Sequence, residues 1–183
     1  MSKIGKLYLD VHGVLADFVR WSHLVHEKEY SHPECWLFHK NWGISSDEFW
    51  EVINDSGQDF WEFIPKFEWA DQVVDLLRSR FELTFLSAGG SSVESRVGTA
   101  LWVERNWPDS NIRIDAEKSK YSGHGSYLID DNPANCSGFT AAGGASYLFP
   151  TWSNARNPKS LDMSTERVLN RLRWWIRYVD SHK

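Results

Sequence analysis

The chain has 183 residues and a formal net charge of −5, and 42% of its residues are hydrophobic. This length suits a single domain with a small insert and can bury a substantial core. The acidic balance disfavours broad, non-specific binding to nucleic acid, and no apolar run approaches the roughly 20 residues needed to span a bilayer.

The two cysteines indicate the compartment. Cys35 and Cys136 are far apart and lack the spacing of metal ligands, so we expect ordinary thiols in a reduced, intracellular protein. The first residues lead directly into a short strand, without the pattern of a signal peptide. We therefore expect a cytoplasmic protein with no membrane partner.

Short apolar runs alternate with helical patterns along most of the chain. Strands are predicted over 7–11, 83–86, 127–129 and 146–149, with a weaker one over 112–114. None of these runs alternates cleanly with polar residues, which is typical of strands covered on both faces. Helices are predicted over 70–79, 93–105, 134–142 and 165–179. This order predicts an α/β fold with a Rossmann-like parallel sheet.

Residues 18–67 break this alternation and predict a small helical, aromatic-rich cap inserted after the first strand. Residues 1–17 and 68–183 then form the α/β core. Ser45 followed by Glu48 is a capping box, so a helix is expected to begin there. Six of the eleven tryptophans lie between Trp21 and Trp69. Most can simply fill a core, but together they can also form an aromatic floor for a planar ligand.

Polar side chains follow three of the predicted strands. Asp10 lies at the end of the first, Ser87 follows the second, and Asp130 and Asp131 follow the fourth in chain order. In an open parallel sheet, ligands bind beyond the carboxyl ends of the strands. Each feature alone is weak, because a strand-end aspartate is often a helix cap, but their combination predicts a site at this edge.

The order and spacing of these groups resemble motifs I, II and IV of the haloacid dehalogenase (HAD) phosphatases, over about residues 4–150. Secondary matches resemble the 5′(3′)-deoxyribonucleotidase family. They are Asp-x-x-Gly-Val-Leu-Ala-Asp-Phe from Asp10, a cap of about 50 residues, the pair Phe60-Trp61, the stretch 101–105, Leu-Ile-Asp-Asp-Asn-Pro over 128–133, and the stretches 141–144 and 149–151.

The resemblance implies a set of roles. Asp10 would be the nucleophile that forms an aspartyl-phosphate. Magnesium (Mg²⁺) would be held by Asp10, the backbone carbonyl of His12, and one or both of Asp130 and Asp131. Ser87 would donate a hydrogen bond to the phosphate, helped by backbone N–H groups near Ala88 and Gly89.

The resemblance also implies a lysine that offsets the phosphate charge, and a base-binding surface on the cap. Lys118 and Lys120 compete for the first role; spacing to the fourth-strand aspartates favours Lys120, with Lys118 assisting. The cap residues that are candidates for contact with the base are Phe60, Trp61, Trp42 and Trp50.

His12 departs from the family pattern, which has a second aspartate there. That aspartate protonates the leaving oxygen and then activates water, and such acid–base catalysis contributes about 10²–10⁴-fold. Three interpretations remain open. His12 replaces the aspartate as acid and base; or the chain is a disabled phosphatase that still binds nucleotide and metal; or His12 is structural and water reaches the site by other means.

Three functions follow. The leading prediction is a Mg²⁺-dependent phosphatase acting on (deoxy)ribonucleoside monophosphates. The alternatives are a catalytically disabled, HAD-like nucleotide- or phosphate-binding protein, and a 3′-phosphatase acting on nucleic-acid ends. The acidic charge and the enclosing cap disfavour extended nucleic acid as a partner, and a homodimer is compatible with the tryptophan-rich surface.

Overall fold

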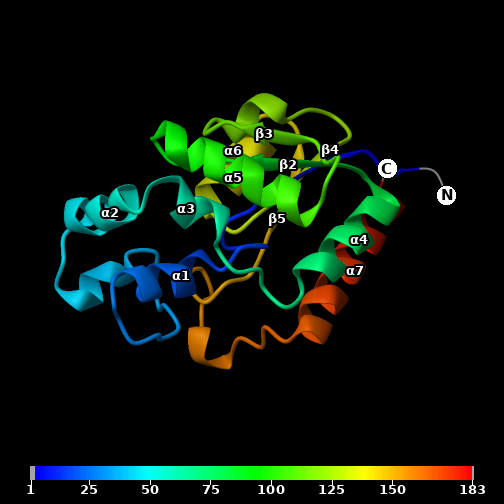
Figure 1. The fold of residues 1–183 in the computed structure, drawn as a ribbon. Coiled ribbons are helices and arrows are strands. Elements are labelled where there is room, and N and C mark those ends of the chain that lie inside the picture. The colour runs from blue at the N-terminus through cyan, green and yellow to red at the C-terminus, as the bar shows by residue number, and fades with distance from the viewer. Residues whose placement is uncertain (1–2, 183) are drawn as a thin grey trace.

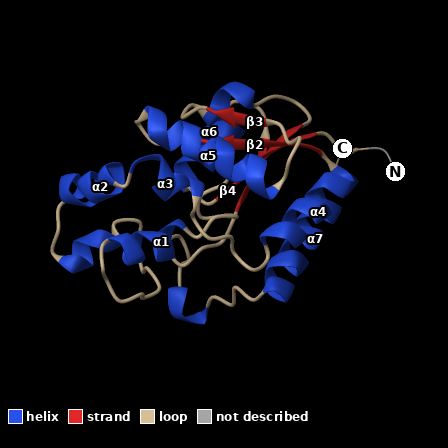
Figure 2. Ribbon diagram, viewed as in Figure 1, coloured by secondary structure: helices blue, strands red, loops and turns tan. Residues whose placement is uncertain are grey.

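The computed structural model describes residues 3–182, and its centre is a five-stranded sheet (Figures 1 and 2). The strands are β1 (Lys6–Leu9), β2 (Glu82–Ser87), β3 (Ile112–Ile114), β4 (Ser126–Asp130) and β5 (Ala145–Leu148). Their spatial order is β3-β2-β1-β4-β5, and every neighbouring pair is parallel. The predicted α/β class and parallel sheet are confirmed.

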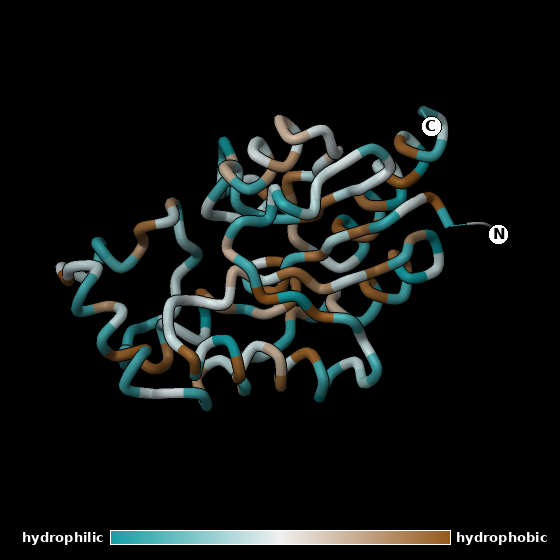
Figure 3. The backbone as a smooth tube through the Cα atoms, turned by 90° about the horizontal axis from the view of Figure 1, so that it is seen from above, coloured by the Kyte–Doolittle hydropathy of each residue, from teal (hydrophilic) through white to brown (hydrophobic). Residues whose placement is uncertain are grey.

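Helices cover both faces of this sheet. Successive side chains of a strand point to opposite faces, and Leu7 and Leu9 of β1 belong to the large core cluster whereas Tyr8 packs on a smaller one. The large cluster also takes in helices α4 (Ala70–Arg80), α5 (Val93–Asn106) and α7 (Thr165–Ser181), while α6 (Pro133–Ala141) contributes to the smaller one. Figure 3 shows hydrophobic stretches running through the central strands.

The segment that was predicted to form a cap holds four short helices beside the sheet. They are α1 (Phe18–Val25), the 3₁₀ helix η1 (Phe38–Trp42), α2 (Ser46–Asp55) and α3 (Gly57–Glu62). The predicted capping box begins α2, because Ser45 Oγ accepts from the Glu48 N–H and Glu48 accepts from the Ser45 N–H. The division into cap and core stays a prediction, since both parts contribute to one continuous hydrophobic cluster.

Helix α3 packs closely on α5, and a glycine makes this approach possible. A Cβ at Gly98 would lie 2.6 Å from the Gln58 carbonyl oxygen and 2.7 Å from the Trp61 Cβ. Gly98 thus lets α3 lie against the core and fixes the position of Trp61.

Two further 3₁₀ turns, η2 (Lys118–Tyr121) and η3 (Pro158–Ser160), complete the regular structure. Within residues 3–182, no helix combines the length and apolar character that crossing a membrane requires.

Candidate functional site

The candidate site lies at the carboxyl edge of the sheet, where three neighbouring strands end. Asp10 directly follows β1, Ser87 is the last residue of β2, and Asp130 is the last residue of β4. Because β1 lies between β2 and β4, these groups converge, as the sequence predicted. They line one end of a cavity of about 440 Å³ that extends under the cap.

The loop after β1 is a tight turn that presents Asp10. The strand ends at Leu9, two residues earlier than predicted, and the Val11 carbonyl accepts hydrogen bonds from the N–H groups of Leu15 and Ala16. Gly13 has a φ of +84°, which favours glycine. A Cβ at this position would overlap the Asp131 carboxylate. The glycine therefore permits this turn and the close approach of Asp131.

Lys118 connects two of the buried carboxylates. Its Nζ donates to Asp10 Oδ1 and to Asp130 Oδ2, both at 2.6 Å. Burial disfavours the charge on Lys118, but the two carboxylates together outweigh this effect and raise its pKa. Lys118 thus holds Asp10 in place as a permanent cation.

The preference for Lys120 over Lys118 was wrong. The Lys120 side chain is 55% exposed and pairs at the surface with Glu117 at 3.0 Å and Asp115 at 3.8 Å. The two lysines lie in the short turn η2, and only Lys118 faces the cavity. Spacing along the chain could not identify which of the two would point inward.

Asp10, Asp130 and Asp131 form a buried cluster that could hold a metal ion, with one oxygen of each within 4.8 Å of the others. Asp130 is the most fully engaged, because its oxygens accept from Lys118, the Asn132 N–H and Asn135 Nδ2. Among residues 3–182, no other residue donates a hydrogen bond to the Asp131 carboxylate. Asp131 and the second oxygen of Asp10 therefore offer the freest ligand atoms.

Electrostatics in the cluster favours a cation. Burial, followed by the charge of Asp10, raises the pKa of Asp130 to about 6. The same causes raise the pKa of Asp131 well above its ordinary value. A single lysine does not balance three adjacent carboxylates, so a hard divalent cation with oxygen ligands fits this donor set.

His12 lies between this cluster and the cap. Its Nδ1 is 3.3 Å from Ser87 Oγ, and its ring lies edge-on to Trp61 with the centroids 5.2 Å apart. Its Nε2 is buried and has no hydrogen-bond partner. Burial and, secondarily, the charge of Lys118 lower the pKa of His12 to about 3. The imidazole is therefore neutral near pH 7.

The loop after β2 carries the predicted phosphate-binding groups into the cavity. Ser87, Ala88 and Gly89 all line it. The Gly89 N–H donates to Ser87 Oγ at 3.3 Å, and Ser95 Oγ donates to the Gly89 carbonyl at 2.7 Å. The start of α5 thus fixes this loop.

Of the four cap residues predicted to contact the base, two line the cavity and two do not. Trp50 and Trp61 line the cavity and stack with their ring centroids 6.5 Å apart. Phe60 and Trp42 do not line it. Phe60 is 1% exposed and packs in the core, and Trp42, the last residue of η1, packs against Phe38 and against Phe49 of α2.

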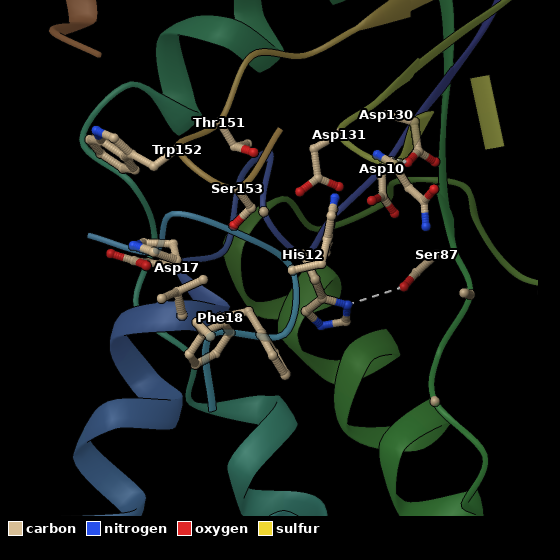
Figure 4. A pocket seen from close by; sticks show the side chains of 18 of the residues that line it. Asp10, His12, Asp17, Phe18, Ser87, Asp130, Asp131, Thr151, Trp152 and Ser153 are labelled. Carbon is tan, nitrogen blue, oxygen red and sulfur yellow. Dashed lines mark hydrogen bonds between the residues drawn. The ribbon is translucent and has the colours of Figure 1, made fainter. Parts of the chain in front are cut away.

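Sequence reasoning missed two groups that line the cavity. Asp17 and Phe18, at the start of α1, lie across His12 from Ser87 in Figure 4. Thr151, Trp152 and Ser153 come from the loop after β5. Asn154 Nδ2 ties this loop to the Asp131 and Phe149 carbonyls at 2.7 and 2.9 Å. The strand-end rule applied to β5 would have found the second group.

No family model and no curated protein sequence matches this chain. Solved structures do resemble it. A haloacid dehalogenase-like family hydrolase from Streptococcus pneumoniae superposes with a TM-score of 0.55 at 12% identity, over 94% of this chain and 100% of that one. A structure described as a dehalogenase gives a TM-score of 0.58 at 8% identity, covering 93% and 98%. A second hydrolase from Streptococcus pneumoniae gives 0.50 at 14% identity, covering 82% and 95%. The chain therefore has the fold of the haloacid dehalogenase-like hydrolases.

Proposed function

We propose that this protein is a Mg²⁺-dependent phosphomonoesterase of the HAD type that acts on (deoxy)ribonucleoside monophosphates through an aspartyl-phosphate on Asp10. One observation carries the proposal. The Asp10 carboxylate, held by Lys118 at 2.6 Å, shares the end of an aromatic-walled cavity with Asp131 and the Ser87 hydroxyl.

The first chemical step uses the free oxygen of Asp10. Lys118 occupies Oδ1, so Oδ2 attacks phosphorus, the bond from phosphorus to the alcohol oxygen breaks, and that oxygen takes up a proton from solvent water. Lys118 and the Ser87 hydroxyl face the phosphate oxygens and offset their charge. Asp10, Asp131 and the backbone carbonyl of His12 would hold Mg²⁺, which when bound adds positive charge beside the transferring phosphoryl group.

The second step is hydrolysis of the aspartyl-phosphate, and His12 suits this step better than the first. A neutral imidazole accepts a proton from water and so activates it. Because the pKa of His12 is lowered to about 3, little of the protonated form exists near pH 7 to protonate the leaving alcohol. His12 is therefore a competent base and a poor acid in this site.

The shape of the cavity supports a small, planar substrate. Its volume of about 440 Å³ falls within the usual range for small-molecule sites, about 300–1,000 Å³. Trp50 and Trp61 form a stacked aromatic wall, which favours a flat base. The cap lies over the cavity, which favours a mononucleotide over the end of a nucleic acid.

A second candidate is a nucleotide-binding protein without turnover. It is favoured by the contact between His12 Nδ1 and Ser87 Oγ, because this contact engages the hydroxyl that the phosphate would use. In this case Asp10, Asp131 and Lys118 would still bind metal and phosphate.

The test is release of inorganic phosphate from a panel of nucleoside monophosphates with Mg²⁺ present, beside the Asp10→Asn variant. The proposal predicts release by the native protein and none by Asp10→Asn. Thermal stabilisation by nucleotide without any release would support the binding protein. Equal release by both proteins would contradict a nucleophilic Asp10.

A further inference from the structure

The cavity has a surplus of negative charge. Four aspartates line it, Asp10, Asp17, Asp130 and Asp131, and Lys118 is the one lysine or arginine among its lining residues. Lys118 is already engaged by Asp10 and Asp130. A divalent cation would balance the cluster at the sheet edge, but Asp17 lies apart from that cluster, across His12 (Figure 4). No lysine or arginine of the cavity wall compensates its charge; Arg20, whose charge acts on Asp17, lies outside the lining.

Asp17 has acceptor capacity to spare. It caps α1 by accepting the Arg20 backbone N–H on Oδ1 at 3.1 Å. Within residues 3–182, no ion pair forms on its carboxylate. The Arg20 side chain is exposed, does not line the cavity, and lies over the Tyr30 ring at 5.7 Å. A carboxylate accepts about four hydrogen bonds and donates none, so Asp17 can still receive donors from a ligand.

The surroundings of Asp17 fit a ligand with both flat apolar and donor surfaces. Phe18 and Trp152 lie on the same side of the cavity (Figure 4). The cavity lining also holds Thr151, which is 8% exposed and whose Oγ1 is buried without a hydrogen-bond partner. A buried hydroxyl without a partner is unfavourable, and a polar group of a ligand would supply that partner. Burial raises the pKa of Asp17 and outweighs the opposing effects of the Arg20 N–H and the Arg20 charge.

We infer that the alcohol part of the substrate carries nitrogen-bound hydrogens that donate to Asp17, and that Asp17 discriminates against substrates with a carbonyl oxygen or a second anion there. This inference rests on the proposed function for the placement of the phosphate at Asp10. The donor can come from an amino-bearing nucleobase or from an alkylammonium group, since both present N–H to a carboxylate.

The matched ligands are dCMP and dUMP. They differ at ring position 4, where an amino group stands in place of a carbonyl oxygen, and at the neighbouring N3, which accepts a hydrogen bond in cytosine and donates one in uracil. Their dissociation constants are measured by quenching of tryptophan fluorescence in the non-hydrolysing Asp10→Asn background with Mg²⁺. We expect dCMP to bind about tenfold more tightly, because a hydrogen bond to a charged group typically has this effect.

The matched variant adds Asp17→Asn. Asparagine caps helices about as well as aspartate, so α1 is retained, but its amide both donates and accepts. The ratio of the dissociation constants of dUMP and dCMP should then fall from about ten to about one. Equal affinities for dCMP and dUMP before this change, or a ratio that Asp17→Asn leaves unaltered, would exclude an amino-bearing base as the source of the donor.

A third comparison identifies the source of the donor. Aminoethyl phosphate and ethyl phosphate have the same chain with and without the ammonium group. If only this pair shows an Asp17-dependent preference for the amine, the substrate is an alkylammonium compound. If only the nucleotide pair shows one, the donor is the amino group of a base. If neither pair shows one, the inference fails.

Dissociation constants test this inference, whereas phosphate release tests the proposed function, so the two can fail independently. Phosphate release by the native protein without any effect of Asp17 would leave the phosphatase standing and remove the inference. Discrimination in binding without release from any ligand would support the role of Asp17 and contradict catalysis.

Discussion

His12 Nδ1 and Ser87 Oγ lie 3.3 Å apart, so the residue that departs from the family pattern contacts the hydroxyl expected to bind phosphate. If His12 Nδ1 accepts, the Ser87 O–H must leave the ring to donate to phosphate; if Nδ1 carries the proton, the hydroxyl is free to donate. The ring is also packed edge-on against Trp61, so the predicted cap and the proposed catalytic edge of the sheet meet at His12. In the proposed function, the residue that binds phosphate and the residue that activates water for its release are therefore in direct contact.

The first prediction concerns the leaving group. Because a neutral His12 is a poor acid, the native protein should act much better on p-nitrophenyl phosphate, whose leaving group needs no proton, than on a nucleoside monophosphate. The variant His12→Asp should raise kcat for the nucleotide by about 10²-fold, the lower range of general acid catalysis, and change the nitrophenyl ester far less.

Steady-state kinetics on both esters measures this effect. A similar gain on both would mean that His12 limits hydrolysis of the aspartyl-phosphate, and a loss on both would mean that His12 is the adapted catalyst for both steps. Either result would contradict the assignment of His12 as a base alone.

The second prediction compares the two lysines. Lys118→Met should lower kcat/KM by about 10²-fold or more, since it removes the cation that holds Asp10 and faces the phosphate. Lys120→Met should stay within about twofold, because that side chain is exposed and pairs with Glu117. Circular dichroism checks that both variants fold. Comparable losses in the two variants would contradict the placement of Lys118.

The third prediction concerns pH and stability without metal. The folded pKa of Asp130 is raised to about 6, against about 3.9 for an unfolded aspartate. The folded state therefore binds more protons between about pH 4 and pH 6, and this contribution to stability is lost as the pH rises through that window. The loss should be on the order of 3 kcal/mol.

Urea unfolding in EDTA measures this effect, with Asp130→Asn as the control. The free energy of unfolding of the native protein should fall more steeply with rising pH than that of the variant. Adding Mg²⁺ should restore stability at pH 7, because an ion that binds only the folded state stabilises it. Parallel curves for the two proteins, or no effect of Mg²⁺, would contradict this account of the carboxylate cluster.

The fourth prediction tests the packing that positions Trp61. Gly98→Ala places a Cβ 2.7 Å from the Trp61 Cβ, so it should cost about 1–3 kcal/mol by overpacking and weaken nucleotide binding. Gly138→Ala is the control: this helical glycine has nothing within 4 Å of an added Cβ. It should stabilise the protein by about 0.4–1 kcal/mol and leave binding unchanged. Thermal unfolding and fluorescence titration measure both quantities, and equal effects of the two changes would contradict the role of Gly98.

The sequence predicted the strands, the main helices and the convergence of Asp10, Ser87, Asp130 and Asp131 because these depend on local patterns. Apolar runs predict strands, and parallel strands deliver their carboxyl ends to one edge. The capping box at Ser45 was also predicted, since its two hydrogen bonds lie within one turn.

The remaining site residues depend on contacts that no local pattern encodes. Phe60 and Trp61 are adjacent on α3, and the packing of that helix at Gly98 decides which one faces the cavity. Lys118 and Lys120 share one 3₁₀ turn, and its orientation decides which reaches Asp10. Trp152 comes from a loop that Asn154 ties to the Asp131 carbonyl, a long-range contact.

The central claim is that Asp10 is the nucleophile, and the most direct measurement is intact-protein mass spectrometry after acid quenching. The native protein is mixed with nucleoside monophosphate and Mg²⁺ for a single turnover, and the same is done with Asp10→Asn. We predict one phosphoryl group on the native protein, located on the peptide that contains Asp10, and none on the variant. Phosphate release without any phosphorylated protein, or a phosphoryl group that persists in Asp10→Asn, would contradict the claim.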